Sequence, residues 1–524
     1  MDMKNSIFTY KAVILLFVLF CFRISNAQSK EKLDYTFNRI ASLYPWLSSS
    51  NPAGLTVKDF NDFSLVQGGV ESKRGGFRNF DDPEKDLNLS AITKSYVSRG
   101  KFVFFGSFGL NHFEKTNMAW SGTIYPRSVI NMLTDSIPGK HLGESYRISA
   151  AGGYRFNQKV SAGLAFDYET ATLAKRVDGR NRNVLSSMEV RPAVMFNLGN
   201  LMAGANLIYK HNAERVEYLF LSDITGKHVY NFQGGWMYMK EGITNSTALD
   251  RGYFSDFFGG ALQGSLSLGS FSLFGELRAD YGRENDFDEY NLLRRYSIAE
   301  ILNYSLRLRA EYKTGINRHI ISLNGAVRER LSYKVENQYE RVPGEANTWS
   351  WYEYGKTLRY YDRVEDYRGT YSLETGDDKW NPSWRFSLEG GVRRYRSEFI
   401  VFPSSYNQDF NISGAELSAL KHIKIGKKSK LDVSLLGGAY KGSGEMLVVT
   451  NPLVYGNLHI ASKLLEDDYL FNISGKILMG GSIKYRISLN ETKGTTLFIE
   501  AGFRQFQRKG LSRSLLSVNT GLKF

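Results

Sequence analysis

The histidines and serines of this chain are the residues that could carry out hydrolysis. An exported hydrolase would need a nucleophile activated by a neighbouring base, as in Ser/His or Asp/His arrangements. The sequence contains no Gly-x-Ser-x-Gly and no His-x-x-x-His among its seven histidines. His112 is expected at the upper end of a strand, where an isolated histidine is an ordinary interfacial residue. We therefore predict no catalytic residue and no enzyme.

Metal-binding residues are equally sparse. Asp286, Asp288 and Glu289 form an acidic cluster in an expected external loop, but their spacing does not match a calcium-binding EF-hand. A solvated loop explains the cluster better. Cys21 is the only cysteine and falls in the expected signal peptide, so a thiolate metal site and a disulfide are both excluded. The sequence predicts no metal and no cofactor.

Aromatic side chains form the one cluster that could bind a ligand at the surface. Trp349, Trp351, Tyr352 and Tyr354 fall in an expected external loop between residues 332 and 356. Such rings could stack on sugars or on a partner protein. They could also anchor the protein at the membrane rim, which is their usual role in membrane barrels.

The first residues of the chain indicate export. Lys4 and Lys11 precede an apolar run over residues 12–22, and Ser25-Asn26-Ala27 provides small residues for cleavage. Residues 1–27 are therefore predicted to be a signal peptide. No second stretch reaches the roughly 18 to 20 consecutive apolar residues that a membrane-spanning helix needs.

The composition favours a β-barrel wall. The chain has 50 Gly, 34 Phe and 32 Tyr but only 10 Pro, and Gly and aromatic residues are typical of barrel walls and girdles. Its net charge of +14 could suit nucleic acid or an anionic membrane. Because the chain is exported, we expect outer-membrane lipids and lipopolysaccharide as its surroundings, and no nucleic acid.

Apolar and polar residues alternate along much of the chain, as expected for strands whose two faces meet lipid and lumen. Tyr304, Leu306, Leu308, Ala310 and Tyr312, for example, alternate with Ser305, Arg307, Arg309, Glu311 and Lys313. We predict an all-β fold, a transmembrane antiparallel up-and-down barrel of about 18 strands, with 14 or 16 as alternatives. The barrel should occupy residues 61–524, in strands near 61–73, 86–98, 101–115, 145–156, 159–173, 187–197, 201–212, 253–268, 271–283, 301–314, 318–333, 357–374, 384–397, 408–425, 430–442, 473–490, 495–508 and 512–524.

The connections between these strands are unequal. Short polar or Gly-containing turns such as Arg99-Gly100 and Gly269-Ser270 alternate with long connections. The long ones are expected at 116–144, 212–252, 284–300, 332–356 and 441–472. Outer-membrane barrels have short periplasmic turns and longer external loops. The protein is thus expected in the outer membrane, with both termini on the periplasmic side.

The last strand carries an expected assembly signal. Leu516, Val518, Thr520, Leu522 and Phe524 share one face, and Phe524 ends the chain. An alternating last strand that ends in an aromatic residue resembles the signal by which the bacterial barrel-assembly machinery recognises its clients. We therefore expect that machinery as a partner.

The segment before the first strand, residues 28–60, contains the turn-forming sequence Asn51-Pro52-Ala53-Gly54-Leu55. An N-terminal Asn-Pro-Ala-Gly stretch before a many-stranded barrel resembles the long-chain fatty-acid transporter (FadL-like) superfamily. That resemblance implies that residues 28–60 fold inside the barrel as a hatch. The other interpretation is a periplasmic turn that leads into the first strand.

The inner face of the expected barrel is charged, which a fatty-acid conduit would not require. We predict lumen positions for Glu276, Arg278, Asp280, Arg307, Arg309, Glu311, Arg385, Glu389, Arg393, Lys484, Arg486, Glu500 and Arg504. These charges could pair across strands or line a path for a polar solute. The leading hypothesis is passive transport of a small hydrophobic or amphipathic compound. The alternative is a barrel that does not transport, but serves as an adaptor or anchor for a secretion or surface complex.

Overall fold

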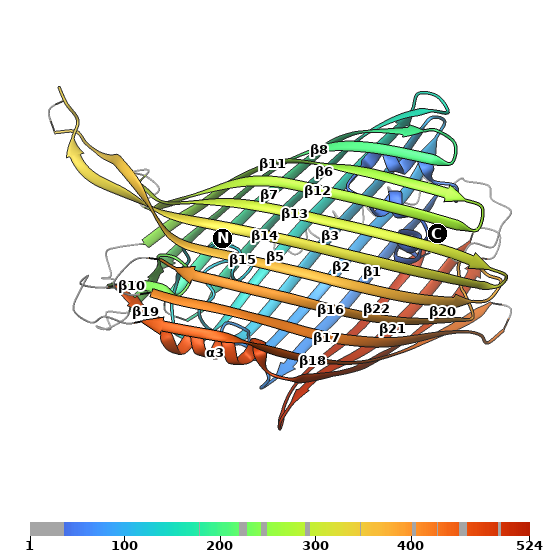
Figure 1. The fold of residues 1–524 in the computed structure, drawn as a ribbon. Helices are drawn as coiled ribbons and strands as arrows, with labels where there is room; N and C mark the ends of the chain where they lie inside the picture. Colours follow the sequence, from blue (N-terminus) through green and yellow to red (C-terminus); the bar gives the residue numbers. More distant parts are fainter. Residues whose placement is uncertain are drawn as a thin grey trace, which may run out of the picture.

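The computed structural model describes residues 36–177, 179–219, 228–242, 249–288, 294–345, 347–400, 405–426, 428–449, 458–490 and 494–524. These residues form an antiparallel 18-stranded sheet that closes into a barrel (Figure 1). The last strand, β22 (Leu511–Lys523), pairs with the first, β1 (Phe63–Gly75), from Leu65 opposite Lys523 onward. The predicted signal peptide, Cys21 and residues 28–35 of the predicted hatch lie outside the described residues.

The predicted number of strands, 18, is confirmed, and each predicted range overlaps one barrel strand in order. Between β1 and β22 the barrel strands are β2 (Lys85–Arg99), β3 (Phe102–Met118), β5 (Gly139–Arg155), β6 (Val160–Lys175), β7 (Arg180–Asn197), β8 (Leu201–Leu219), β11 (Leu249–Leu268), β12 (Phe271–Asp288), β13 (Arg294–Thr314), β14 (Asn317–Arg341), β15 (Trp349–Thr375), β16 (Trp384–Phe399), β17 (Ser405–Lys424), β18 (Ser429–Val449), β20 (Lys476–Asn490) and β21 (Thr495–Arg508).

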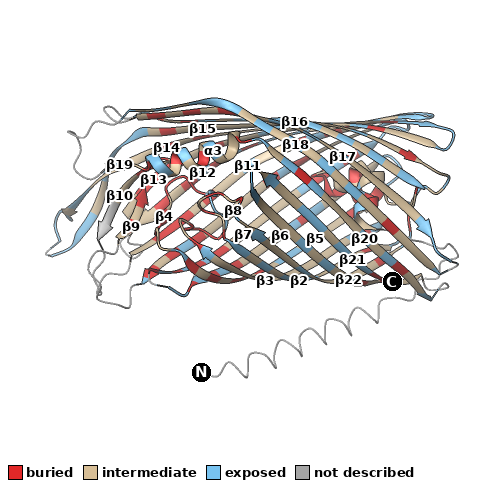
Figure 2. Cartoon of the chain, turned by 90° about the horizontal axis from the view of Figure 1, so that it is seen from below, coloured by how far each residue is buried: buried red, intermediate tan, exposed pale blue. Residues whose placement is uncertain are grey.

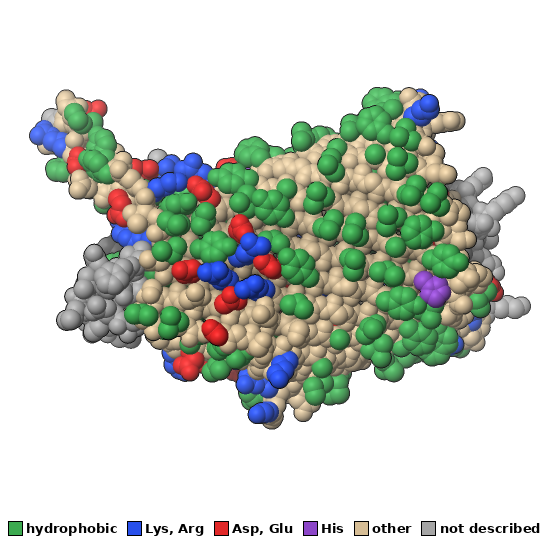
Figure 3. All heavy atoms as spheres, viewed as in Figure 1, with side chains coloured by type: hydrophobic (Ala, Val, Ile, Leu, Met, Phe, Trp, Pro, Cys, Tyr) green, Lys and Arg blue, Asp and Glu red, His purple; other side chains and the backbone are tan. Residues whose placement is uncertain are grey.

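The barrel is apolar on the outside, which is the reverse of a water-soluble protein. On β13, Tyr304, Leu306 and Tyr312 are between 43% and 51% exposed, while Arg307 and Arg309 reach inward. Figure 2 shows exposed residues alternating with more buried ones along the strands. Figure 3 shows hydrophobic side chains spread over the outer face, with charged side chains of both signs gathered toward one half. A closed barrel with this exterior is the architecture of an outer-membrane protein.

The two ends of the barrel differ. Next to the chain's C-terminus, β11 and β12 are joined by residues 269–270 alone, and β13 and β14 by 315–316. The opposite end carries the longest connections, including 119–138 and 450–475. Short turns mark the periplasmic end of an outer-membrane barrel and long loops its external end. Both described termini of the barrel therefore lie at the periplasmic end.

Two of the predicted long loops are mostly strand. Every described residue of the predicted loop 284–300 is strand, and of 332–356 only 342–345 and 347–348 are described outside strands. The loop prediction was wrong because these strands continue beyond the membrane: a spanning strand needs only roughly 10 residues, whereas β14 has 25 and β15 has 27. Ladder hydrogen bonds between β14 and β15 instead continue from Asn317–Thr375 to Arg341–Trp349.

The β14–β15 hairpin leaves the barrel before it ends. The pairing of β14 with β13 stops at Lys334, and that of β15 with β16 stops at Tyr360. Beyond these residues the two strands pair only with each other, over residues 335–341 and 349–356. We call this part the projecting ribbon; it extends past the rim in Figure 1. The predicted strand 357–374, with its Tyr360-Tyr361 irregularity, forms the part of β15 that stays in the barrel.

The external mouth contains a second, four-stranded sheet that the sequence did not predict. It consists of β4 (Leu133–Thr134), β9 (His228–Phe232), β10 (Met237–Gly242) and β19 (Leu458–Ile460), followed by the helix α3 (Ser462–Ile473). We call residues 119–138, 228–242 and 458–474 the external cap. Buried apolar residues join the cap to the inner wall: Val129 and Leu133 pack with Val216, Tyr218 and Tyr253. In the described part of the chain, no helix is both long and apolar enough to cross a membrane.

Candidate functional site

Residues 36–62 form the N-terminal segment, which lies within the periplasmic end of the barrel (Figure 1). It comprises the helix α2 (Phe37–Leu43) and two 3₁₀ turns, η1 (Pro45–Ser48) and η2 (Pro52–Val57). Each turn begins with proline, whose fixed φ suits a first helical position. The Asn51 side chain accepts a hydrogen bond from the Ala53 amide at 2.9 Å and so caps η2.

Asn51 also fastens this turn to the barrel wall. Its amide nitrogen donates to the Val194 carbonyl at 3.0 Å and to Gln263 Oε1 at 2.9 Å. The side chain is 2% exposed. Pro52, Ala53, Gly54 and Leu55, which complete the predicted hatch motif, are buried as well. One asparagine therefore shapes the turn and binds two strands, β7 and β11.

The neighbouring Ser50 joins the same buried network. Its amide donates to Glu276 Oε2 at 2.8 Å, and its hydroxyl donates to Asn206 Oδ1 at 2.9 Å. Gln263 Nε2 donates to Asn206 Oδ1 at 2.8 Å and to the Ser50 hydroxyl at 3.1 Å. Buried polar groups of this kind are costly to leave unpaired, so the network favours one seated position of the segment.

Two further side chains seat the segment on the wall. Trp46 donates from its ring nitrogen to the Ser265 hydroxyl at 2.8 Å and meets the Phe274 ring edge-on at 5.7 Å. Thr56 donates to the Ser161 hydroxyl at 3.0 Å. These contacts come from β6, β11 and β12, so together with those of Asn51 they seat the segment on a run of neighbouring strands from β6 to β12.

Glycines in the wall make room for this close approach. A methyl group at Gly204 of β8 would lie 2.7 Å from the Asn51 amide nitrogen and 2.9 Å from the Trp46 ring. At Gly163 of β6 it would collide with the Ala53 backbone. In contrast, a methyl group at Gly109 of β3 would meet nothing within 4 Å. The wall is therefore hollowed where the segment sits.

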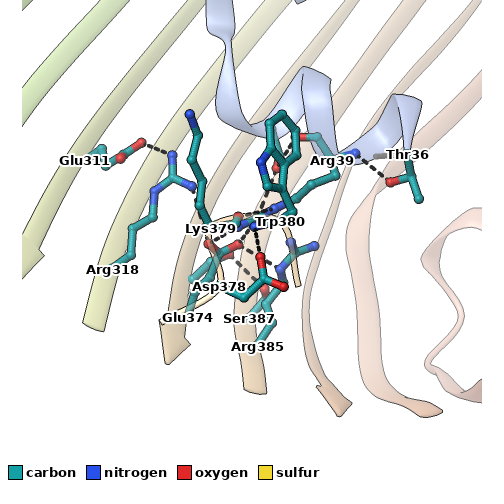
Figure 4. Close-up of polar contacts among 12 residues, drawn as sticks. Thr36, Arg39, Glu311, Arg318, Glu374, Asp378, Lys379, Trp380, Arg385 and Ser387 are labelled. Carbon is teal, nitrogen blue, oxygen red and sulfur yellow. Dashed lines mark hydrogen bonds and ion pairs between the residues drawn. The ribbon is translucent and has the colours of Figure 1, made fainter. Parts of the chain in front are cut away.

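The start of the segment is held by an ionic cluster at the periplasmic rim (Figure 4). Arg39 forms an ion pair with Glu374 and donates to the Lys379 carbonyl; its Nη2 lies 2.9 Å from Glu374 Oε2. Arg385 approaches the same carboxylate at 2.9 Å, and Arg318 at 3.5 Å.

At the end of the segment, burial would raise the pKa of Asp62, but Lys58 at 2.8 Å and the Ser98 amide outweigh it and lower that pKa.

Three cavities lie in or at the mouths of the barrel. A periplasmic cavity of about 520 Å³ is lined by Tyr44 and Trp46. A middle cavity of about 520 Å³ is lined by Arg278 and Asn303, and an upper cavity of about 590 Å³ by cap residues such as Trp236. Cavities of this size are typical of small-molecule sites.

The N-terminal segment separates the periplasmic cavity from the middle one. Ser50 and Ser48 bind Glu276 of β12 and Arg307 of β13, the latter at 2.9 Å from Nη2 to the Ser48 carbonyl. On the same strands, Phe274 and Arg309 line the periplasmic cavity, and Arg278 and Ser305 line the middle one. The two residues bound by the segment thus lie between the linings of the two cavities.

At the upper cavity the cap is fastened by charged contacts. Arg127 lies 2.7 Å from Asp81 and 2.7 Å from Asp468 on α3. Burial alone would lower the pKa of Arg127, but these two carboxylates outweigh it and raise that pKa, so the side chain stays charged. Deeper in the mouth, Arg251 donates to Asp288 at 2.6 Å and to the Asn131 carbonyl at 2.8 Å.

The four aromatic residues that could bind a surface ligand lie together on one element. Trp349, Trp351, Tyr352 and Tyr354 lie on the projecting ribbon rather than in a loop; Trp349 and Tyr354 are 52% and 61% exposed. The Tyr339 ring stacks on Trp349 with its centroid 5.7 Å away, and Arg294 lies 4.7 Å above Trp351.

Asp286 and Asp288 of the predicted acidic cluster do not lie in a solvated loop. Asp286 and Asp288 are part of β12, and Asp286 is fully buried beside Asn131, whose Nδ2 lies 3.1 Å away. The solvated-loop prediction was wrong for these two residues because β12 continues into the cap. Glu289 lies outside the described residues. Within the described ranges no group of three His, Cys, Asp or Glu side chains is arranged to hold a metal ion.

The residues of the predicted assembly signal lie on and just after β22, the strand that closes the barrel against β1. Leu516 and Val518 are 52% and 49% exposed on the outer face, and Thr520 is exposed too, whereas Leu522 is half-buried. Phe524 exchanges backbone hydrogen bonds with Ser64, at 2.7 and 3.0 Å. The final residue thus extends the β1–β22 ladder by one position.

The model of a family described as a family of unknown function (DUF6850) matches residues 52–524, which is the barrel together with η2. The chain belongs to this family. No curated protein matches the chain. Among solved structures it is similar to the outer membrane transporter YddB from Escherichia coli, at 10% identity over 89% of this chain and 81% of that one, with a TM-score of 0.40. It is also similar to a mutant of the monoaromatic hydrocarbon channel TodX, at 12% identity over 95% and 97%, with a TM-score of 0.30.

Proposed function

We propose that this DUF6850 member is a passive outer-membrane transporter that admits a small hydrophobic or amphipathic compound. The N-terminal segment would act as its hatch. The observation that carries the proposal is the partition of the lumen: residues 48–50 bind the wall between the periplasmic and middle cavities. A solute that passes the barrel must displace this segment or move around it.

The lining of the cavities supports an amphipathic solute. Trp236, Phe410 and Ile412 give the upper cavity an apolar side, and charged residues give it a polar one. In the periplasmic cavity, Tyr44 and Trp46 lie close to Arg309 and Glu311. Such mixed linings suit a molecule with an apolar body and a polar group better than a wholly apolar or a wholly ionic one.

The contacts of the segment suit a movable hatch. Its polar contacts are mainly hydrogen bonds to side chains of the wall, which water can replace when the segment moves. Trp46 and Leu55 pack beside them against apolar residues of the wall. Each such bond has a net worth of only about 0.5–1.5 kcal/mol, so a local displacement costs far less than opening the wall. The wall itself is a continuous ladder of 18 strands and stays closed.

Solute flux into proteoliposomes tests this function. We choose benzyl alcohol derivatives that are too polar to cross lipid unaided. With full-length protein, these should enter the liposomes faster than sugars of similar volume. The physical reason is that only the former can bury an apolar group against the cavity walls. Equal flux of both kinds of solute would indicate a non-selective pore. Flux no faster than in protein-free liposomes would contradict transport.

The projecting ribbon favours a second function, an adaptor or anchor for a secretion or surface complex. The ribbon extends beyond the ladders of β13 and β16, although Asn337 and Glu353 still contact Arg295 of β13. It exposes Tyr339, Trp349 and Tyr354, at 45%, 52% and 61%. Exposed aromatic residues are enriched where proteins bind partners. Absence of flux in the liposome experiment would favour this second function.

A further inference from the structure

Two lumen arginines stand at the junction of the upper and middle cavities without an acidic partner. Arg328 of β14 and Arg393 of β16 line both cavities. Across the described ranges, neither forms an ion pair with a carboxylate. Arg328 Nε is buried without any hydrogen-bond partner in the same part of the chain. A buried, unmatched cationic donor is costly, so Arg328 indicates that an anion completes the site, and Arg393 is exposed beside it.

The other arginines of the two cavities are neutralised. Arg330 forms an ion pair with Asp362 at 2.6 Å, and Arg278 with Asp280 at 3.1 Å. Arg127 is held between Asp81 and Asp468. Asp366 lies opposite Arg393 in the sheet register, but its two oxygens accept from Arg368 at 2.7 and 2.9 Å. Among the arginines that line the two cavities, only Arg328 and Arg393 lack a carboxylate partner within the described ranges. Lys210 of the middle cavity is a further cation, and its Nζ lies 5.8 Å from the centroid of the Phe257 ring.

The geometry lets both arginines reach one ligand. β15 lies between them, and Arg328 faces Val364 while Arg393 faces Asp366. Their backbones are therefore two strand spacings apart across the sheet and two residues apart along it, roughly 12 Å. Val364 of β15, between the two, lines both cavities as well. Two guanidinium groups on long side chains can span this distance and share a carboxylate or phosphate, each with parallel N–H donors.

The surroundings of the arginines define the rest of the ligand. Tyr395, Phe410 and Ile412 line the upper cavity beside them, and Trp236 of the cap lines it too. An inorganic anion would leave this apolar surface in contact with water. A molecule with an apolar body and one oxyanion group would cover it, within a cavity of about 590 Å³.

We infer that Arg328 and Arg393 bind the carboxylate or phosphate group of a small, partly apolar organic anion where the upper and middle cavities meet. The inference rests on the proposed function in that the bound anion would be the transported compound. The site would select anions over neutral and cationic analogues of the same size.

Equilibrium dialysis of the full-length protein in detergent tests this site, with benzoate, phenyl phosphate, inorganic phosphate, benzyl alcohol and benzylamine as probes. Benzoate or phenyl phosphate should bind, and the tighter of the two identifies the oxyanion. Arg328→Gln and Arg393→Gln should each weaken binding about tenfold or more, as expected for the loss of a charged hydrogen-bond donor. Inorganic phosphate should bind more weakly than phenyl phosphate.

Arg504→Gln is the matched control, because Arg504 shares the lumen-facing register of β21 but lines neither cavity. It should leave binding unchanged. Equal binding of benzoate, benzyl alcohol and benzylamine would overturn the inference, as would no binding of either organic anion. An equal loss in Arg504→Gln would do the same, because it would indicate a diffuse charge effect. Binding needs no passage through the barrel, so an anion that binds without flux would contradict the transporter and leave the site standing.

Discussion

Deletion of residues 36–58 is expected to raise the single-channel conductance in planar bilayers by about tenfold, because a barrel of this size without its lumen filling holds an aqueous channel. The deleted residues include Ser48, Ser50 and Asn51, whose contacts with β11–β13 separate the periplasmic and middle cavities. Refolded barrels are first checked by their heat-dependent migration on a denaturing gel, so that only closed barrels are compared.

A deletion of the projecting ribbon, residues 338–352, is the matched control. It removes residues from outside the barrel and should leave the conductance at the level of the full chain. If the barrel without residues 36–58 stayed as closed as the full chain, the external cap alone would account for closure. The N-terminal segment would then not be a hatch.

Replacement of Phe524 by Asp, or its deletion, is expected to lower the amount of folded protein in the outer membrane at least about tenfold. A charged side chain near a membrane interface costs a barrel only about 0–1 kcal/mol, too little to unfold 18 strands. The backbone hydrogen bonds between Phe524 and Ser64 are only one position of the closing ladder. A large loss would therefore reflect failed recognition by the assembly machinery.

The measurement is the amount of heat-modifiable barrel in isolated outer membranes. Lys523→Gln is the control, because Lys523 points away from the lipid-facing row of Leu516 and Val518. It should reduce the amount far less than the Phe524 variants. Equal amounts in all variants would contradict a role of the final aromatic residue in assembly.

The barrel could be predicted from the sequence because its signal is repeated 18 times. Along β13, the outward-facing residues Tyr304, Leu306 and Tyr312 all fall at even-numbered positions, and a short turn at 315–316 follows. The external cap gave no such signal. β4 has two residues and β19 has three, too few for any alternation to show. Its contacts join distant parts of the chain, as from Arg251 to Asn131 and from Arg127 to Asp468.

The candidate site was predictable only in part. Asn51-Pro52 was identified as a turn, since side-chain capping and proline act locally. The hollows at Gly163 and Gly204 depend on which strands the segment meets, so the sequence could not distinguish them from Gly109. Arg393 was placed in the lumen by its position in the alternation, but Arg328 was not singled out. Whether either has a carboxylate partner depends on neighbouring strands and on α3, which no pattern along one strand reveals.

The central claim is that the N-terminal segment must leave the wall for solute to pass, and a reversible cross-link tests it most directly. The Thr56 and Ser161 hydroxyl oxygens lie 3.0 Å apart, so cysteines at both positions should form a disulfide that ties η2 to β6. The single cysteine variants serve as controls. Flux of the amphipathic solute through the oxidised Thr56→Cys/Ser161→Cys protein should fall to that of protein-free liposomes and return to the full-chain level on reduction. Equal flux in the oxidised and reduced protein would contradict the account.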